Sequence, residues 1–291
     1  MNNKIVIITS EFPPLPGGIG NHAYHLAKGL SENKRQITVV TNQRSKKINE
    51  DVIFDKKQPF EIIRIKRYFF LGITYLLRLL AVLKIFILEK PSVVIASGKF
   101  SLWLGAISTI FFKNQKYVAV LHGSEIYAGG FLSQTFTKWS LKRFDKLIAV
   151  SQFTKELVLQ QNPSLTITVI NNGFSFTAVK KNQIVAKRNP NIITVGNVTY
   201  RKGQQNVIAA LPLLKTKFSD IHYHIIGTPT EQKKFTHLAD TLGVLDLVTF
   251  HGVLSDADLK NIVLSSDVFF MLSDNLKNGD VEGFGIAILE A

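Results

Sequence analysis

The chain has 291 residues, of which 46% are hydrophobic and 19% are charged, and it contains no cysteine. This composition excludes a disordered chain, a disulfide scaffold, a thiolate metal site and a cysteine nucleophile, and the length favours two domains. The net charge of +14 is uneven, because residues 1–150 hold 22 Lys and Arg against 9 Asp and Glu, whereas residues 151–291 hold 13 against 12. The basic first half predicts an anionic partner, with a generic solubilising surface as the alternative.

Short apolar runs alternate with helical patterns along the chain, which is typical of parallel sheets built from β–α–β units. The first half predicts strands over 5–9, 37–41, 93–96, 117–121, 146–150 and 168–170, and helices over 21–30 and 153–160. The second half predicts strands over 191–195, 222–226, 248–250 and 268–272, and helices over 204–214, 230–242, 255–265 and 283–291. Residues 177–191 are polar and basic and predict a linker, so we expect domains over 1–178 and 179–291.

Each series of elements begins with a Gly-rich turn after its first strand, and ligands of such sheets bind outside the carboxyl ends of the strands. The expected fold is therefore α/β, with two Rossmann-like domains facing across a cleft. Because the chain stops at Ala291, within the second series, we expect the second domain to be incomplete.

Residues 64–90 form an unusual apolar segment. The part from Phe69 to Leu88 has the length of a membrane span, but Arg78 and Lys84 lie inside it, so a spanning helix is not expected. One interpretation is a buried or half-buried helix of the first domain. The other is a surface that rests on lipid headgroups, formed by Arg64, Lys66, Arg67, Tyr68, Phe69 and Phe70.

The N-terminus indicates where the protein acts. Its apolar run over 5–8 is too short for a signal peptide, which favours a cytoplasmic protein. Together with the basic first half, it leads us to expect a peripheral contact with the anionic inner face of the membrane.

Gly-rich and basic turns follow the first strand of each series. Residues 13–20 include three glycines ahead of a helix, where the backbone can approach a ligand and free N–H groups favour an anion; a plain tight turn is the alternative. Residues 197–203 place Arg201 and Lys202 at the matching turn of the second series. Two cations there suit a diphosphate, and a solvated surface pair is the alternative.

Two further motifs suit a sugar nucleotide. His122 directly follows a predicted strand and is a ligand-binding candidate, with a structural histidine as the alternative. Glu282 and Glu290 are eight helical steps apart, about 12 Å. Carboxylates at the two ends of such a helix can accept from hexose and ribose hydroxyls while amides near 283–286 face a diphosphate. The alternative, a capped amphipathic helix, would not favour two glycines at its start.

These motifs, in this order and spacing, resemble the retaining glycosyltransferases of the GT-B fold, the group that includes the phosphatidylinositol mannosyltransferases and many capsule and O-antigen enzymes. The resemblance runs through nearly the whole chain, and the glutamate pair around Gly283-Phe284-Gly285 is its most specific part. Supporting positions are Gly17–Gly20, His122-Gly123, Ala149-Val150-Ser151, Asn172-Gly173, Arg201 to Gln204, Ile226-Gly227 and Phe250-His251-Gly252.

The resemblance implies a role for each motif. Lys202 is expected to bind the donor diphosphate and stabilise the leaving group, Glu282 to hold hexose hydroxyls, and Glu290 to hold the ribose. His122 is expected to contact the transferred sugar near C6. The other implied donor contacts are Gly17, Gly18, Asn197, Arg201, Gly227, His251, Gly252, Val253, Phe284, Gly285 and Ile286.

The sequence departs from the family pattern in two places. The family usually has a diphosphate-binding Arg where this chain has Asn197, and Arg201 is the candidate that replaces its charge. The chain also ends one residue after Glu290, whereas relatives continue with further strands and helices and a last helix that returns to the first domain.

The sequence therefore predicts an enzyme that transfers a hexose, with retention, from GDP-mannose or a UDP-sugar to a lipid-linked or saccharide acceptor in cell-envelope polysaccharide or glycolipid synthesis. The expected catalytic residues are His122, Lys202 and Glu282. No metal is expected, because no acidic metal cluster follows a strand. No other cofactor is expected either, and of the anionic partners that the charge allows, a lipid-linked acceptor or membrane is expected and nucleic acid is not. The alternatives are a nucleotide-sugar epimerase of the UDP-GlcNAc 2-epimerase type and an inactive, truncated nucleotide-binding remnant.

Overall fold

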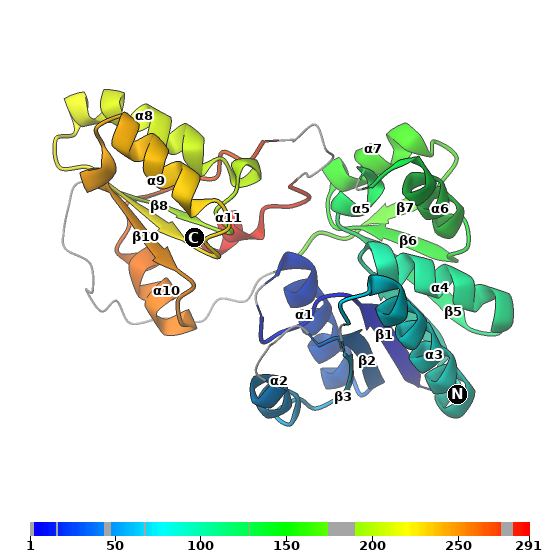
Figure 1. The fold of residues 1–291 in the computed structure, drawn as a ribbon. Coiled ribbons are helices and arrows are strands. Elements are labelled where there is room, and N and C mark those ends of the chain that lie inside the picture. Colours follow the sequence, from blue (N-terminus) through cyan, green and yellow to red (C-terminus); the bar gives the residue numbers. More distant parts are fainter. Residues whose placement is uncertain are drawn as a thin grey trace. The chain divides into compact units, whose positions relative to one another are not determined.

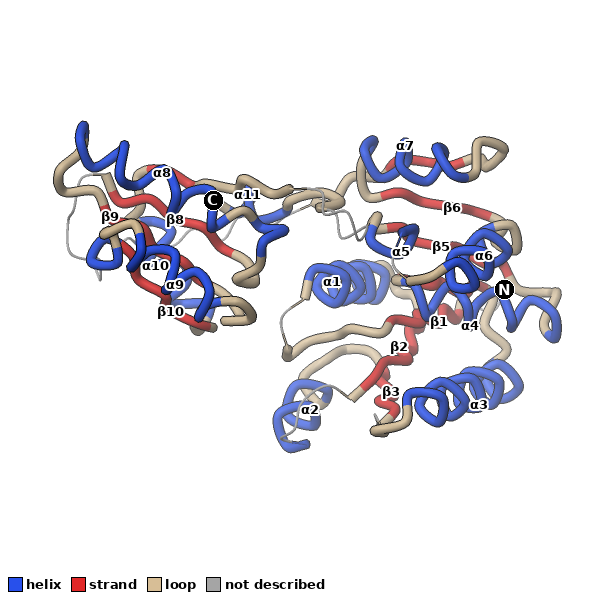
Figure 2. The backbone as a smooth tube through the Cα atoms, turned by 45° about the horizontal axis from the view of Figure 1, so that its top comes forward, coloured by secondary structure: helices blue, strands red, loops and turns tan. Residues whose placement is uncertain are grey.

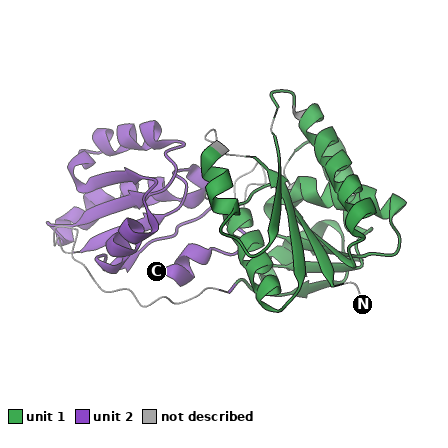
Figure 3. Ribbon diagram, turned by 90° about the horizontal axis from the view of Figure 1, so that it is seen from below, with its two compact units in different colours: residues 1–172 green, residues 173–291 purple. Residues whose placement is uncertain are grey.

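The computed structural model describes residues 3–15, 17–43, 48–66, 68–127, 129–173, 190–274 and 282–291. The chain divides into two compact units, residues 1–172 and 173–291 (Figure 3). Each unit is an α/β domain with a parallel sheet, which confirms the predicted fold class. The boundary predicted at 178/179 lies outside the described residues.

The sheet of unit 1 has seven strands in the order β3-β2-β1-β4-β5-β6-β7. The strands are β1 Lys4–Thr9, β2 Gln36–Asn42, β3 Glu61–Ile65, β4 Val93–Ser97, β5 Lys116–Leu121, β6 Lys146–Ala149 and β7 Ile167–Val169. β1 reads as a continuous apolar run because both faces of the sheet are covered. The chain leaves β1 toward β2 and later returns to β4 on the other side of β1, which is the switch point where such sheets bind ligands.

Helices cover both faces of this sheet. Figure 2 shows α1 and α2 on one side and α3 and α4 on the other. On the α3 side, Val82 and Phe86 of α3 and Leu104 of α4 pack on Val6 and Ile8 of β1. The helices of unit 1 are α1 Gly18–Glu32, α2 Ile48–Asp55, α3 Leu71–Glu89, α4 Lys99–Phe111, α5 Ser124–Tyr127, α6 Phe131–Leu141 and α7 Gln152–Gln161.

The apolar segment over 64–90 begins in β3 and continues as α3, a half-buried helix, as the first interpretation predicted. The interpretation as a lipid-headgroup surface is wrong for Arg64. Its Nε and Nη2 donate to the two carboxylate oxygens of Asp55 at 2.8 Å, and Asp51 lies 3.6 Å from its Nη1. Within the described part of the chain, no helix combines the length and apolar character that crossing a membrane requires.

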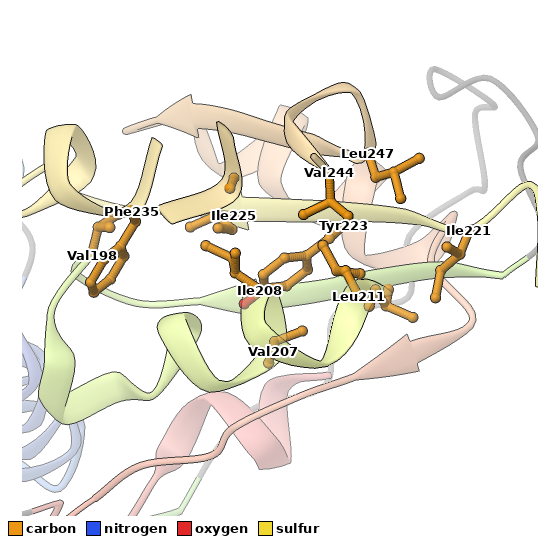
Figure 4. Close-up of a cluster of buried hydrophobic side chains, with 12 residues drawn as sticks. Val198, Val207, Ile208, Leu211, Ile221, Tyr223, Ile225, Phe235, Val244 and Leu247 are labelled. Atoms are coloured by element: carbon orange, nitrogen blue, oxygen red, sulfur yellow. The ribbon is translucent and has the colours of Figure 1, made fainter. Parts of the chain in front are cut away.

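The sheet of unit 2 has four strands in the order β10-β9-β8-β11. Figure 4 shows a buried cluster in which Val207 and Ile208 of α8 and Phe235 of α9 pack with Tyr223 and Ile225 of β9. α10 packs on the opposite face through Ile262. The elements are β8 Asn191–Val195, the 3-10 helix η1 Tyr200–Lys202, α8 Gln204–Lys217, β9 His222–Ile226, α9 Gln232–Thr241, the 3-10 helix η2 Leu245–Leu247, β10 Val248–Gly252, α10 Asp256–Leu264, β11 Val268–Phe269 and α11 Ile286–Glu290 (Figure 1).

Candidate functional site

Two glycines shape the turn that follows β8. Gly196 has φ +151, and a Cβ there would lie 3.1 Å from Cε of Lys202. Gly203 has φ +78, and a Cβ there would lie 1.9 Å from the carbonyl oxygen of Leu272. Because residue 203 is glycine, the 3-10 helix over 200–202 can lie close to the segment after β11. The Lys202 side chain then lies against Gly196.

Arg201 and Lys202 both contact Glu282. Arg201 Nη1 and Lys202 Nζ each donate to Glu282 Oε2 at 2.5 Å, and the Gly285 N–H donates to Oε1 at 3.2 Å. The three charged side chains are 18%, 13% and 24% exposed, respectively, so they are partly withdrawn from water yet accessible. We call these three residues the ionic cluster; it unites two motifs that lie far apart in the sequence.

The carboxyl of Glu282 is ionised at neutral pH. Burial opposes ionisation of Glu282, but the charges of Lys202 and Arg201 outweigh it and hold the pKa of this carboxyl below its usual value. The cluster therefore has two cations and one anion. A phosphate group could balance the remaining positive charge and accept hydrogen bonds from the two cations.

Arg201, and not Asn197, supplies the second charge beside Lys202. Asn197 is exposed, and its backbone oxygen accepts from Gln204 Nε2 at 3.0 Å. Arg201 contacts the same carboxylate oxygen as Lys202. The structure thus brings Arg201 beside Lys202, and the replacement of the family's arginine by Arg201 stays a prediction.

The helix after Glu282 is shorter than expected. Helix α11 covers 286–290, so Glu282 lies in the turn before the helix and not on it. Gly285, with φ +73, is the N-cap, and the half-buried Phe284 and Ile286 flank it. Glu290 is exposed, although neighbouring atoms partly desolvate its carboxyl and, with a smaller effect of Asp256, raise its pKa. Its predicted contact with ribose stays a prediction.

The positions predicted to surround the base gather at the ends of β9 and β10. The Gly227 N–H donates to the Gly252 oxygen at 2.8 Å. A Cβ at Gly227 would lie 2.1 Å from the Gly196 oxygen, so only glycine allows the three strand ends to pack this closely. The backbone there is close-packed next to the turn that carries Lys202.

His251 and Val253 differ in their surroundings. His251 Nε2 lies 3.0 Å from His224 Nδ1, and burial lowers the pKa of His251. Val253 is exposed. A planar base could pack on the apolar side chain of Val253, but the predicted contacts of both residues stay predictions.

In unit 1, His122 follows β5 and belongs to a small polar group. Its Nε2 lies 2.9 Å from Ser97 Oγ, and its ring packs edge-on against His22 with centroids 5.0 Å apart. Burial, with smaller effects of neighbouring imidazoles, lowers the pKa of His122 to about 3 and that of His22 to about 4. Both rings are neutral at pH 7, so His122 can exchange a hydrogen bond with a hydroxyl but offers no charge to a phosphate.

The glycines at the start of α1 have different surroundings. Gly17 is the N-cap of α1, and a Cβ at Gly18 would meet no atom within 4 Å. A Cβ at Gly20 would lie 3.1 Å from backbone atoms of Glu11 and Phe12. Gly20 is therefore needed for packing, whereas the open space at Gly18 is consistent with a close approach by a ligand.

Sequence reasoning gave no role to His22 or Glu125. The buried Glu125 Oε1 accepts the His122 backbone N–H at 2.8 Å and so fixes the turn after β5; burial raises the pKa of its carboxyl. The spacing of three residues between His122 and Glu125 was a usable signal for such a turn. The contact between His22 and His122 joins residues 100 positions apart, and no local pattern indicates it.

Known glycosyltransferases are similar to this chain along nearly its whole length. One subunit of the human phosphatidylinositol N-acetylglucosaminyltransferase is 22% identical over 298 residues, which cover 99% of this chain and 60% of the relative. The GDP-mannose-dependent monoacylated alpha-(1-6)-phosphatidylinositol monomannoside mannosyltransferase of Corynebacterium glutamicum is 24% identical over 315 residues, which cover 100% of this chain and 78% of the relative. The chain thus spans less than two thirds of the human relative's length.

The fold of the chain is similar to that of a solved structure. Sucrose-phosphate synthase from Thermosynechococcus elongatus matches with a TM-score of 0.78 at 16% identity, over 99% of this chain and 78% of that chain. Residues 16–177 match the family described as Glycosyltransferase Family 4, and residues 176–291 match the family described as Glycosyl transferases group 1. The chain therefore belongs to the glycosyltransferases of family 4 and group 1.

Proposed function

We propose that this protein transfers a hexose from a nucleotide diphosphate sugar to an acceptor hydroxyl, with retention of configuration. The observation that carries the proposal is the ionic cluster, in which Arg201 and Lys202 converge on Glu282 Oε2 beside the carboxyl end of β8. Open α/β sheets bind ligands at this edge, and two cations suit a diphosphate.

The chemistry follows from this placement. When the bond between the anomeric carbon and the donor phosphate breaks, the diphosphate takes the electron pair, and Lys202 and Arg201 stabilise its charge. The acceptor hydroxyl attacks from the face that the diphosphate leaves, and a phosphate oxygen takes its proton. Oε2 of Glu282 accepts from both cations and Oε1 accepts one hydrogen bond, so Oε1 has acceptor capacity left for a hexose hydroxyl while the carboxylate positions the cations. The reaction so described requires no metal ion.

The relatives indicate the substrate classes. The Corynebacterium relative is named for GDP-mannose, and both relatives are named for phosphatidylinositol or its mannoside. We therefore favour GDP-mannose over a UDP-sugar as donor and a lipid-linked over a soluble saccharide acceptor. Such a reaction belongs to glycolipid or cell-envelope polysaccharide synthesis at the inner face of the membrane.

The test is product analysis with matched variants. Purified protein is incubated with GDP-mannose or a UDP-hexose, with and without a phosphatidylinositol-containing lipid extract, and products are identified by mass spectrometry and the anomeric configuration by NMR. We expect donor consumption only with acceptor, loss of it in Lys202→Met, and no loss in Lys215→Met, whose lysine is exposed on α8. Conversion of donor without acceptor would indicate an epimerase, and the absence of any donor binding would overturn the proposal.

A further inference from the structure

Helix α3 carries apolar side chains on its exposed side as well as on its buried side. The buried side includes Val82, Ile85 and Phe86, and also Thr74 and Arg78, which are 2% and 0% exposed; Arg78 Nη2 donates to the Thr9 oxygen at 3.2 Å. Its outer side carries apolar side chains that are 46–70% exposed: Ile73, Leu76, Leu80, Ile87 and Leu88. A surface helix in water normally hides apolar residues and exposes polar ones, so water alone does not explain this arrangement.

The exposed apolar residues form a continuous surface. Positions 73, 76, 80, 84 and 87 are separated by three or four residues and so share one side of the helix. Lys84 is the charged member of this stripe. The exposed Phe69 and Phe70 extend it before the helix. We call Phe69, Phe70 and the five exposed apolar residues of the helix the α3 face.

Neighbouring elements continue this surface and border it with positive charge. α4 lies beside α3 on the same side of the sheet (Figures 1 and 2), and the ring of Phe86 lies 5.4 Å from that of Phe112 at the ends of the two helices. Ile110 and Phe111 of α4 are exposed near this end. Exposed lysines lie on the segments that flank these residues: Lys66, Lys84, Lys90, Lys113 and Lys116.

We infer that the α3 face docks on an anionic lipid bilayer, with the helix lying in the plane of the interface. Apolar side chains would enter the region between headgroups and acyl chains, and the lysines would contact the anionic headgroups. The charge of the first half of the chain argues for lipid over a second copy of the protein, because two copies of this basic surface repel each other. The inference rests on the lipid-linked acceptor of the proposed function and assigns the surface that meets it.

The experiment is co-sedimentation with vesicles of phosphatidylcholine alone or with about 30% phosphatidylglycerol, a composition chosen to present anionic headgroups. We expect binding to the anionic vesicles that falls as salt rises, because screening weakens the lysine contacts. The double variant Leu76→Ser and Leu80→Ser is expected to lose binding by about tenfold or more, because it removes apolar area from the centre of the α3 face.

A matched control separates this effect from general loss of surface apolarity. Leu213→Ser with Phe218→Ser removes two exposed apolar side chains from the α8 region of unit 2 and is expected to bind vesicles like the wild type. Thermal unfolding and GDP binding, measured on all variants, report folding and donor chemistry independently of lipid.

The outcomes are distinct. Equal vesicle binding by the wild type and the α3 double variant would overturn the inference, as would no binding by the wild type. A wild-type dimer that the α3 variant converts to a monomer in light scattering would assign the face to a second copy instead. Loss of vesicle binding by the α3 double variant with unchanged GDP binding supports the inference. A wild type that binds neither GDP nor UDP would count against the proposed function alone.

Discussion

Lys202 Nζ lies 2.5 Å from Glu282 Oε2, although the two residues are 80 positions apart in the sequence. Arg201 reaches the same oxygen, so one carboxylate organises both cations. The lysine can lie there because Gly196 and Gly203 leave room for the turn that carries it. The electrostatic part of the site is therefore assembled before a ligand arrives, which lowers the cost of reorganisation on binding.

Replacement of Glu282 is expected to affect nucleotide binding and hexose transfer differently. Glu282→Gln removes the anion that competes with phosphate for Lys202 and Arg201, so a nucleoside diphosphate is expected to bind equally well or a few-fold more tightly. Transfer is expected to fall at least about 100-fold, because the carboxylate that orients the cations, and that we propose holds the hexose, is lost. Calorimetric titration with GDP and a rate assay check this; weaker GDP binding together with normal transfer would contradict it.

Two glycines of α1 distinguish a ligand contact from packing. Gly18→Ala places a methyl group where no protein atom lies within 4 Å, so the thermal stability is expected to stay the same or rise slightly, while donor turnover falls. Gly20→Ala pushes a methyl group against backbone of Glu11 and Phe12 and is expected to destabilise unit 1 by about 1–3 kcal/mol. Unfolding curves and donor kinetics test both, and full activity in Gly18→Ala would remove Gly18 from the site.

Gly203 is expected to be the least tolerant glycine of unit 2. An added Cβ would lie 1.9 Å from the Leu272 oxygen, in addition to the strain of φ +78. Gly203→Ala is therefore expected to cost more than about 3 kcal/mol or to prevent folding. Gly243→Ala is the control, because its φ of +64 gives backbone strain of about 1–2 kcal/mol without any clash. Similar chemical-denaturation midpoints for the two variants would contradict the described turn.

The two neutral histidines of unit 1 make its stability depend on pH. Because burial lowers the pKa of His22 to about 4 and that of His122 to about 3, the unfolded chain binds more protons than the folded chain below pH 6.5. Each neutral ring therefore contributes to the free energy of unfolding above pH 6.5. This contribution falls as the pH falls, by about 2 kcal/mol for each ring between pH 6.5 and pH 5. Denaturation of His22→Gln at pH 7 and 5 is expected to show a smaller loss than the wild type, with the exposed His237→Gln as control.

Several elements could be predicted from the sequence because their local signals were strong. β8 and β9 have the predicted bounds of 191–195 and 222–226, since each contains buried apolar residues and ends directly before a glycine. Helix α4 was not predicted. It is buried on several sides, including small polar residues such as Ser101 and Ser108, and so lacks the one-sided periodicity that marks a helix. β3 and α2 were also not predicted, because they are short and only partly apolar and so give no clear strand or helix pattern.

The candidate site was predictable as a set of residues but not as a geometry. The identities of Lys202, Arg201 and Glu282 came from their motifs, whereas their meeting at one oxygen depends on how distant loops pack. The last helix was predicted too long, because Gly283 and Gly285 favour a turn and a left-handed cap over helix. Of the α3 face, the sequence indicated only Phe69 and Phe70, as part of one of two interpretations. Its helical part was not predicted, because an apolar segment does not reveal which of its sides the sheet covers.

The central claim is that Lys202 and Arg201 bind the donor diphosphate, and calorimetric titration with GDP and UDP tests it most directly. The wild type is expected to bind at least one of them, while Lys202→Met weakens that binding about tenfold or more through the loss of a charge-assisted contact. Lys215→Met, which removes an exposed lysine of the same unit, is expected to bind like the wild type. Equal affinity of the wild type and Lys202→Met for both nucleotides would contradict the account.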